Sequence, residues 1–129
     1  MAACAVLAAC GGGDGTPTAP GPPSFAGEWS GTTFQGRPIS FSVSADQKVT
    51  SAAVGYVFGG CSGVDTLSGL NETITNGFTQ FGRTLPDGRG IGVSIGFVAE
   101  RAANGVVVFY GQSSCGSTEG AGPFGASKR

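Results

Sequence analysis

Large apolar and small polar residues alternate along most of the chain from Phe25 onward, which is the period of a β-strand with one buried face. Residues 39–43 alternate Ile, Phe and Val with serine, and residues 90–97 alternate glycine or serine with Ile, Val and Phe. No segment keeps a helical period for more than two turns. The pattern therefore predicts about eight strands: 27–34, 38–44, 48–58, 69–75, 78–82, 89–99, 105–112 and 122–127.

Turn sequences separate these runs. Asn76-Gly77 and Asn104-Gly105 are typical of two-residue hairpin turns, because both residue types tolerate positive φ. Pro86-Asp87-Gly88 and Ala45-Asp46-Gln47 predict two more turns. Since most connections are short, strands that are neighbours in sequence should be neighbours in the sheet. We expect an all-β protein, an antiparallel meander of about eight strands that forms a small β-barrel or β-sandwich, preceded by a disordered tether.

The strand predicted from residue 105 is apolar on both faces. We expect Val106, Val108 and Tyr110 to face the core and Val107 and Phe109 to face outward. An exposed apolar pair of this kind marks a candidate binding surface. The alternative is that a loop or the tether covers it.

The first residues differ in composition from the rest. Leu7-Ala8-Ala9-Cys10 resembles the lipobox of bacterial lipoproteins. The resemblance implies that Cys10 carries a diacylglyceryl group and that residues 1–9 are the remnant of a signal peptide. A signal peptide has a basic start and a longer apolar core, so we expect the true start codon to lie upstream of Met1. Gly11 after the cysteine implies sorting to the outer membrane, as in lipoproteins of enterobacterial type.

The chain is thus predicted to have three parts: a signal-peptide remnant at 1–9, a lipidated cysteine with a Gly/Pro-rich tether at 10–24, and a β domain at 25–129. The apolar run before Cys10 is too short to span a bilayer, which takes about 20 residues as a helix. The predicted location is the cell envelope, with the lipid on Cys10 as the membrane anchor.

Two cysteines belong to the β domain. Cys61 and Cys115 fall in two longer predicted loops, 59–68 and 113–121. In an oxidising envelope they most simply form one disulfide, which would close a loop of about 55 residues and contribute roughly 4 kcal/mol. A reactive or metal-binding pair is the alternative, but it has neither a CxxC spacing nor a histidine.

Composition bears on the classes of function. The 129 residues include no histidine, which removes the usual general base and the commonest zinc ligand. The net charge is −1 with both signs scattered, so no basic stripe for nucleic acid is present. The glycines of 88–96 precede no helix, so they are interpreted as sites of bending or close backbone approach and not as a phosphate loop. The acids are interpreted as exposed groups of turns and strand faces: Asp65, Glu72, Asp87, Glu100 and Glu119.

Two further resemblances concern the fold. Gly27-Glu28-Trp29 resembles the Gly-x-Trp of lipocalins, which implies a barrel whose base is closed by the tryptophan. A wider pattern resembles a recurring module of bacterial secreted and lipid-anchored proteins, and more weakly the barrel lobes of transferrin-binding-type lipoproteins. That pattern comprises Gly27, Trp29 and Gly31; Ile39 to Val43; Gly60-Cys61; Cys115-Gly116; and Phe124, Ala126 and Lys128. These resemblances imply a fold and no activity.

The sequence therefore predicts a non-enzymatic cell-envelope lipoprotein whose small β module has a binding or structural role. We expect no catalytic residue, cofactor or metal, and no nucleic-acid partner; the partner would be an envelope protein or a small ligand. The alternative is a lipocalin-like carrier of a small apolar ligand. Large inward side chains would compete with such a ligand for the interior, and they favour a filled core.

Overall fold

The computed structural model describes residues 24–113, 116–117 and 119–129, with side chains described outside 112–118. The predictions for Cys10, for the signal-peptide remnant, for most of the tether and for Cys115 lie outside the described residues. The strands are β1 (Gly27–Thr33), β2 (Pro38–Val43), β3 (Lys48–Phe58), β4 (Cys61–Leu67), β5 (Glu72–Thr73), β6 (Phe78–Thr84), β7 (Gly90–Ala99), β8 (Ala102–Tyr110), β9 (Gln112–Ser113), β10 (Gly116–Ser117) and β11 (Gly120–Lys128).

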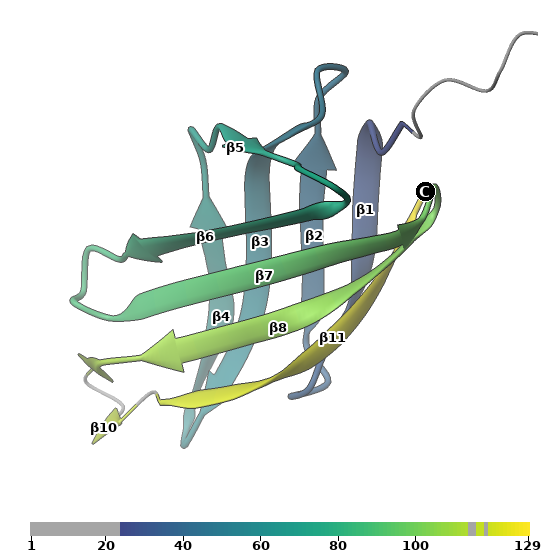
Figure 1. The fold of residues 1–129 in the computed structure, drawn as a ribbon. Helices are drawn as coiled ribbons and strands as arrows, with labels where there is room; N and C mark the ends of the chain where they lie inside the picture. The colour runs from purple at the N-terminus through teal and green to yellow at the C-terminus, as the bar shows by residue number, and fades with distance from the viewer. Residues whose placement is uncertain (1–23, 114–115, 118) are drawn as a thin grey trace, which may run out of the picture.

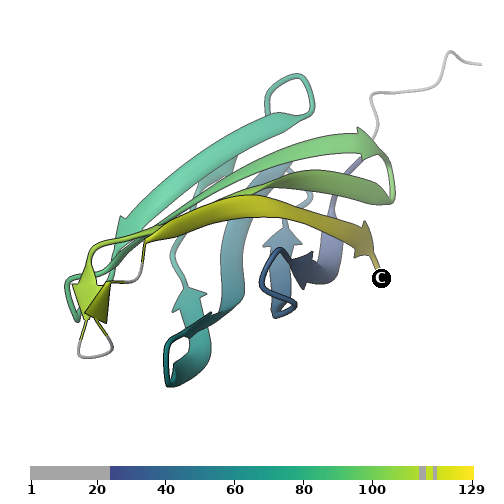
Figure 2. The same cartoon turned by 90° about the horizontal axis from the view of Figure 1, so that it is seen from below.

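Nine of these strands form one antiparallel sheet. Its order is β4-β3-β2-β1-β11-β8-β7-β6, and the short β5 pairs with β3; β9 and β10 form a separate pair. The sheet curls into a half-barrel, in which β6, β7, β8 and β11 cross in front of the layer formed by β1 to β4 (Figure 1). Figure 2 shows the first group arching over the second. The predicted all-β antiparallel meander is confirmed.

The pairing of β1 with β11 joins the two halves of the sheet. Trp29 lies opposite Lys128 in this pair, and Thr33 lies opposite Phe124. The Lys128 ammonium group donates to the carbonyl oxygen of Ser24 at 3.0 Å. Ser24 and Lys128, close to the two ends of the described chain, are therefore neighbours at one end of the molecule.

The core lies between the two layers and is built from the inward residues of both. Trp29 is fully buried, stacks on Phe41 at 5.7 Å between ring centroids, and meets the edge of Phe97 at 5.1 Å. Its indole N–H donates to the carbonyl oxygen of Phe25 at 2.8 Å, so the one polar atom of the ring is satisfied. The core continues as one cluster of buried side chains that includes Ile39, Val49, Val54, Ile91, Val93, Ile95, Val107, Phe109 and Phe124.

One predicted loop is a strand. Residues 59–68 were expected to be a loop, but Cys61–Leu67 form β4, which pairs with β3 after a tight turn at Gly59 and Gly60. The inward positions of β4 after Cys61 are Gly63, Asp65 and Leu67, so only one of the three is apolar. This strand has no run of large inward apolar residues, and the periodicity did not reveal it.

One predicted turn is also wrong. Asn104 and Gly105 lie inside β8, while the turn before this strand falls at residues 100–101. A Cβ at Gly105 would collide with the carbonyl oxygen of Ser94 and would meet the Phe124 ring at 2.8 Å. This glycine permits close packing of neighbouring strands. At Asn76-Gly77, by contrast, both residues have positive φ (53° and 76°), as expected for a hairpin turn.

Candidate functional site: an outer trough and an ionic seam

The outward faces of β6, β7 and β8 form a continuous uncharged surface. In register, Gly82 of β6 lies beside Gly92 of β7, which lies beside Val108 of β8. The outer trough is defined here by nine outward positions: Phe78, Gln80 and Gly82; Gly90, Gly92 and Ser94; and Val106, Val108 and Tyr110. No member of the set carries a charge, and all three strands belong to one layer of the half-barrel (Figure 1).

Glycines keep the floor of the trough low. A Cβ at Gly92 would have its nearest neighbours at 3.9 and 4.0 Å, which is ordinary contact, so the fold does not require glycine there. The space above it is part of an open hollow of about 320 Å³ lined by residues 80–82, 92–94 and Val108. The glycine at 92 therefore leaves room for an outside group.

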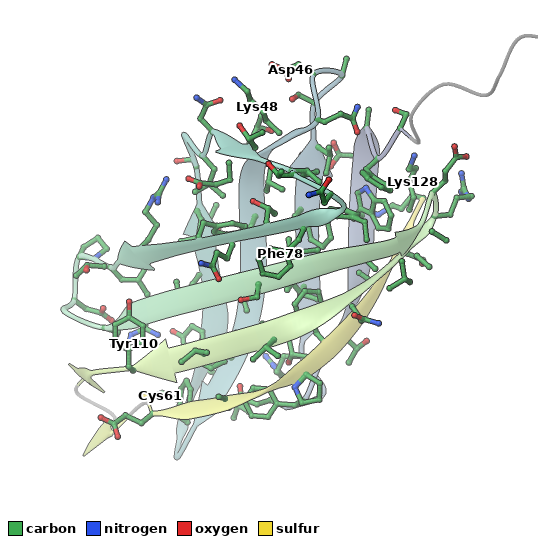
Figure 3. All side chains as sticks on the ribbon, in the orientation of Figure 1. Asp46, Lys48, Cys61, Phe78, Tyr110 and Lys128 are labelled. Carbon is green, nitrogen blue, oxygen red and sulfur yellow. The ribbon has the colours of Figure 1, made fainter. Side chains whose placement is uncertain are left out.

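The walls of the trough are apolar and partly exposed. Val106, Val108 and Tyr110 of β8 are 42%, 39% and 45% exposed, and Phe78 of β6 is 48% exposed. Phe78 and Tyr110 both stand on the viewer's side of this layer in Figure 3, Tyr110 near the arrowhead of β8 and Phe78 nearer the middle of the layer. The Tyr110 ring covers Gly90, where a Cβ would overlap the ring. A gathering of exposed apolar side chains on one strand face is typical of an interaction surface.

The prediction for β8 had the wrong face. Val107 is fully buried and Phe109 is 2% exposed, so neither is a surface residue. Their strand partners on β7 are Val93 and Ile91, which belong to the core. Because β8 is apolar on both faces, its own pattern could not decide the orientation, and the inward alternation of β7 decides it. The outward set comprises Val106, Val108 and Tyr110.

A second notable arrangement lies where the half-barrel is open. The sheet has two edges, β4 and β6, with no strand pairing between them in the described chain. Arg89, in the turn between β6 and β7, donates to both carboxylate oxygens of Asp65 on β4, at 2.8 and 3.1 Å. Arg83 of β6 and Glu72 of β5 approach within 3.6 Å. These two ion pairs form an ionic seam across the gap.

The Asp65–Arg89 pair is buried, with side chains 7% and 8% exposed. The guanidinium group also donates through Nε to Asp87 at 2.7 Å and lies 4.7 Å from the centre of the Tyr56 ring. The hydrogen bonds to Asp65 raise the pKa of Arg89 above its usual value, although burial alone would lower it. The hydrogen bonds from Arg89 lower the pKa of Asp87. The cation is therefore neutralised from both sides.

Asp65 was predicted to be an exposed acid, and this is wrong, because it points inward from an edge strand. An inward charge on an edge strand disfavours pairing with another sheet, since the wrong register would bury it without a partner. Asp87 is exposed, as predicted for a turn residue. The sequence held one hint of the pair, because a charge inside an alternating strand needs a partner of opposite sign.

The predicted disulfide and lipid anchor remain predictions. Cys61 is the first residue of β4 and stands at the end of the molecule where β9 and β10 lie (Figure 3). Its predicted partner Cys115 lies outside the described residues. Among the described side chains, no group of three or more Cys, Asp or Glu is placed to hold a metal ion.

No protein-family model, no curated protein and no solved structure matches this chain. The resemblances noted in the sequence therefore stay predictions. In the part of the chain that the structure describes, no helix is long and apolar enough to cross a bilayer.

Proposed function

We propose that the protein is a non-enzymatic, lipid-anchored module of the bacterial cell envelope that binds another molecule in its outer trough. The observation that carries the binding role is the trough itself. Its glycine floor leaves an open hollow, and its walls hold four exposed large apolar side chains. Apolar side chains exposed to water are unfavourable, and the free energy falls when a partner covers them.

The chemistry of the trough limits the partner. None of its nine residues is charged, so a charged ligand would lose hydration there without gaining an ion pair. Gln80 and Ser94 add hydrogen-bonding groups beside the apolar walls, since they lie opposite each other on β6 and β7. A neutral partner with apolar groups and a few polar atoms fits this lining best.

The interior of the half-barrel supports surface binding over the carrier alternative. A lipocalin-like carrier needs a cavity between its sheets, whereas Trp29, Phe41, Phe97 and Phe109 are buried there in mutual ring contacts or against further aromatics. An eight-stranded barrel has room for side chains or for one small ligand, and these side chains occupy that space.

The proposed lipid anchoring in the cell envelope rests on the lipobox-like Leu7-Ala8-Ala9-Cys10 and on the Gly/Pro-rich residues that follow. It is tested by the intact mass of the protein purified from membranes of a bacterium that expresses its gene. The expected product begins at Cys10, is heavier by a diacylglyceryl group, and is lighter by two hydrogens for the Cys61–Cys115 disulfide. An unmodified chain that still carries Met1 would overturn the proposed lipid anchor and envelope localisation.

The binding part is tested by site-specific photo-cross-linking in the same membranes. Benzoylphenylalanine replaces Val108 in the trough or, as the matched control, Val64 on the outer face of β4, which is 56% exposed. We expect a discrete cross-linked product from position 108 and none from position 64. Adding Gly92→Leu, which fills the hollow, should remove the product. Equal, diffuse labelling from both positions would contradict a binding role for the trough.

A further inference from the structure

We propose that the occupant of the outer trough, in the absence of another partner, is the chain's own proline-rich segment, residues 15–23. This inference rests on the binding role proposed above and assigns the ligand of the same surface. The segment reads GTPTAPGPP and has no charged residue, which matches the uncharged lining. Four of its nine residues are proline.

The entry point of the chain lies close to one end of the trough. Phe25, just after the segment, stacks on Phe97 of β7 at 4.7 Å. The backbone N–H of Phe97 donates to the carbonyl oxygen of Gly77 at 2.8 Å, and the next residue is Phe78, an aromatic wall of the trough. The segment therefore leaves the described domain on the core face of β7, near the end at which Phe78 stands on the outer face, and it must pass over the rim of the sheet to reach the trough.

The length of the segment fits the length of the trough. From Gly96, opposite Phe78, to Gly90, beneath Tyr110, β7 advances six residues, or about 20 Å at 3.3 Å per residue. A polyproline II chain rises about 3.1 Å per residue, so seven residues cover that distance. The 13 residues from Gly11 to Pro23 reach about 40 Å, which leaves enough chain to pass over the rim of the sheet.

The chemistry of the contact is that of polyproline recognition. Proline-rich segments dock in grooves lined by aromatic residues, because they are already extended and lose little conformational entropy on binding. Phe78 and Tyr110 supply the aromatic surfaces, and the glycine floor lets a ring approach the sheet. A short linker also gives an effective concentration on the order of millimolar, so a weak contact is enough to keep the segment bound. An external partner would then compete with the segment and free the tether.

The test uses the full chain with benzoylphenylalanine at position 108, irradiated at a series of dilutions. Cleavage and mass spectrometry locate the cross-linked residues; the expected product joins position 108 to residues 15–23 of the same molecule, with a yield that dilution does not change. Benzoylphenylalanine at position 64 is the control. Replacing Pro17, Pro20, Pro22 and Pro23 by serine should abolish the product without changing the urea midpoint.

The inference is overturned if position 108 never labels residues 15–23, if position 64 labels them equally, or if the product forms only between molecules. Cross-linking in native membranes separates this failure from that of the proposed function. Labelling of another envelope component from position 108, with none of the chain's own segment in any sample, would overturn the self-docking inference and leave the binding role standing.

Discussion

Removing the carboxylate of Asp65 tests whether the ionic seam holds the open half-barrel together. Asp65→Asn leaves the Arg89 guanidinium buried, with Asp87 as its one remaining carboxylate partner. Breaking a buried ion pair from one side costs about 3 to 5 kcal/mol, and we expect about 3 because Asp87 still neutralises the cation. With a urea slope of about 1.5 kcal/mol/M, this lowers the urea midpoint by about 2 M. Trp29, the only tryptophan, reports unfolding through its fluorescence.

A double variant separates loss of the pair from burial of an orphaned charge. Asp65→Leu with Arg89→Met replaces both charges by apolar side chains, and such replacements are commonly neutral or stabilising. We expect its midpoint to lie close to that of the wild type or above it. If Asp65→Asn costs less than about 0.5 kcal/mol, the pair is worth no more than a surface salt bridge and the reasoning fails. It also fails if the double variant is as unstable as the single one.

Three further predictions concern close packing, pH and the disulfide. Gly105→Ala should lower the free energy of unfolding by about 1 to 3 kcal/mol, because its methyl group would collide with a carbonyl oxygen of β7. Gly125→Ala is the control; it has open space around it and should unfold at the wild-type urea midpoint. Equal midpoints for the two variants would refute the close-packing role of Gly105. The pKa of Asp87 is lower in the folded state, so its stabilising effect is present above about pH 4 and is lost as the pH falls through the folded pKa. Asp87→Asn should therefore flatten the fall of the urea midpoint with decreasing pH in this range. A pH dependence equal to that of the wild type would count against the Asp87–Arg89 contact. Reduction, or Cys61→Ser, should remove the contribution of a disulfide to Cys115, which lowers the free energy of unfolding by roughly 4 kcal/mol and the urea midpoint with it. A midpoint insensitive to reductant would argue against that bond.

The sequence predicts the fold well where one alternation dominates. Residues 48–58 were predicted as a strand with the bounds that β3 has, and the inward side chains of β2 and β7 follow the apolar period. These strands have large apolar residues on one face and small or polar ones on the other, so only one orientation buries them.

The sequence fails where the deciding interaction is not local. The orientation of β8 depends on its register with β7, because both of its faces are apolar. β4 is a strand because it pairs with β3, and its inward Asp65 is neutralised by Arg89, 24 positions away in the sequence. Asn104-Gly105 is typical of a turn when the local sequence is considered alone. The glycine lies within β8 because β7 approaches too closely there for a Cβ. The trough is therefore visible only once the three strands are in register.

The junction between β1 and β11 has a consequence for the order in which the chain folds. Apart from the short β5, which pairs with β3, the other neighbouring strands of the main sheet are close in sequence, whereas β1 and β11 lie at opposite ends of the described chain. Two local meanders, β1 to β4 and β6 to β11, can thus form independently and must then meet at a single non-local junction, which is the slow kind of contact to form. A circular permutant opened at Asn76-Gly77, with a linker joining the C-terminus to Ser24, would have all main-sheet strands except β5 in sequence order. Its contact order would be lower, and the half-barrel should assemble faster along an unbroken series of hairpins.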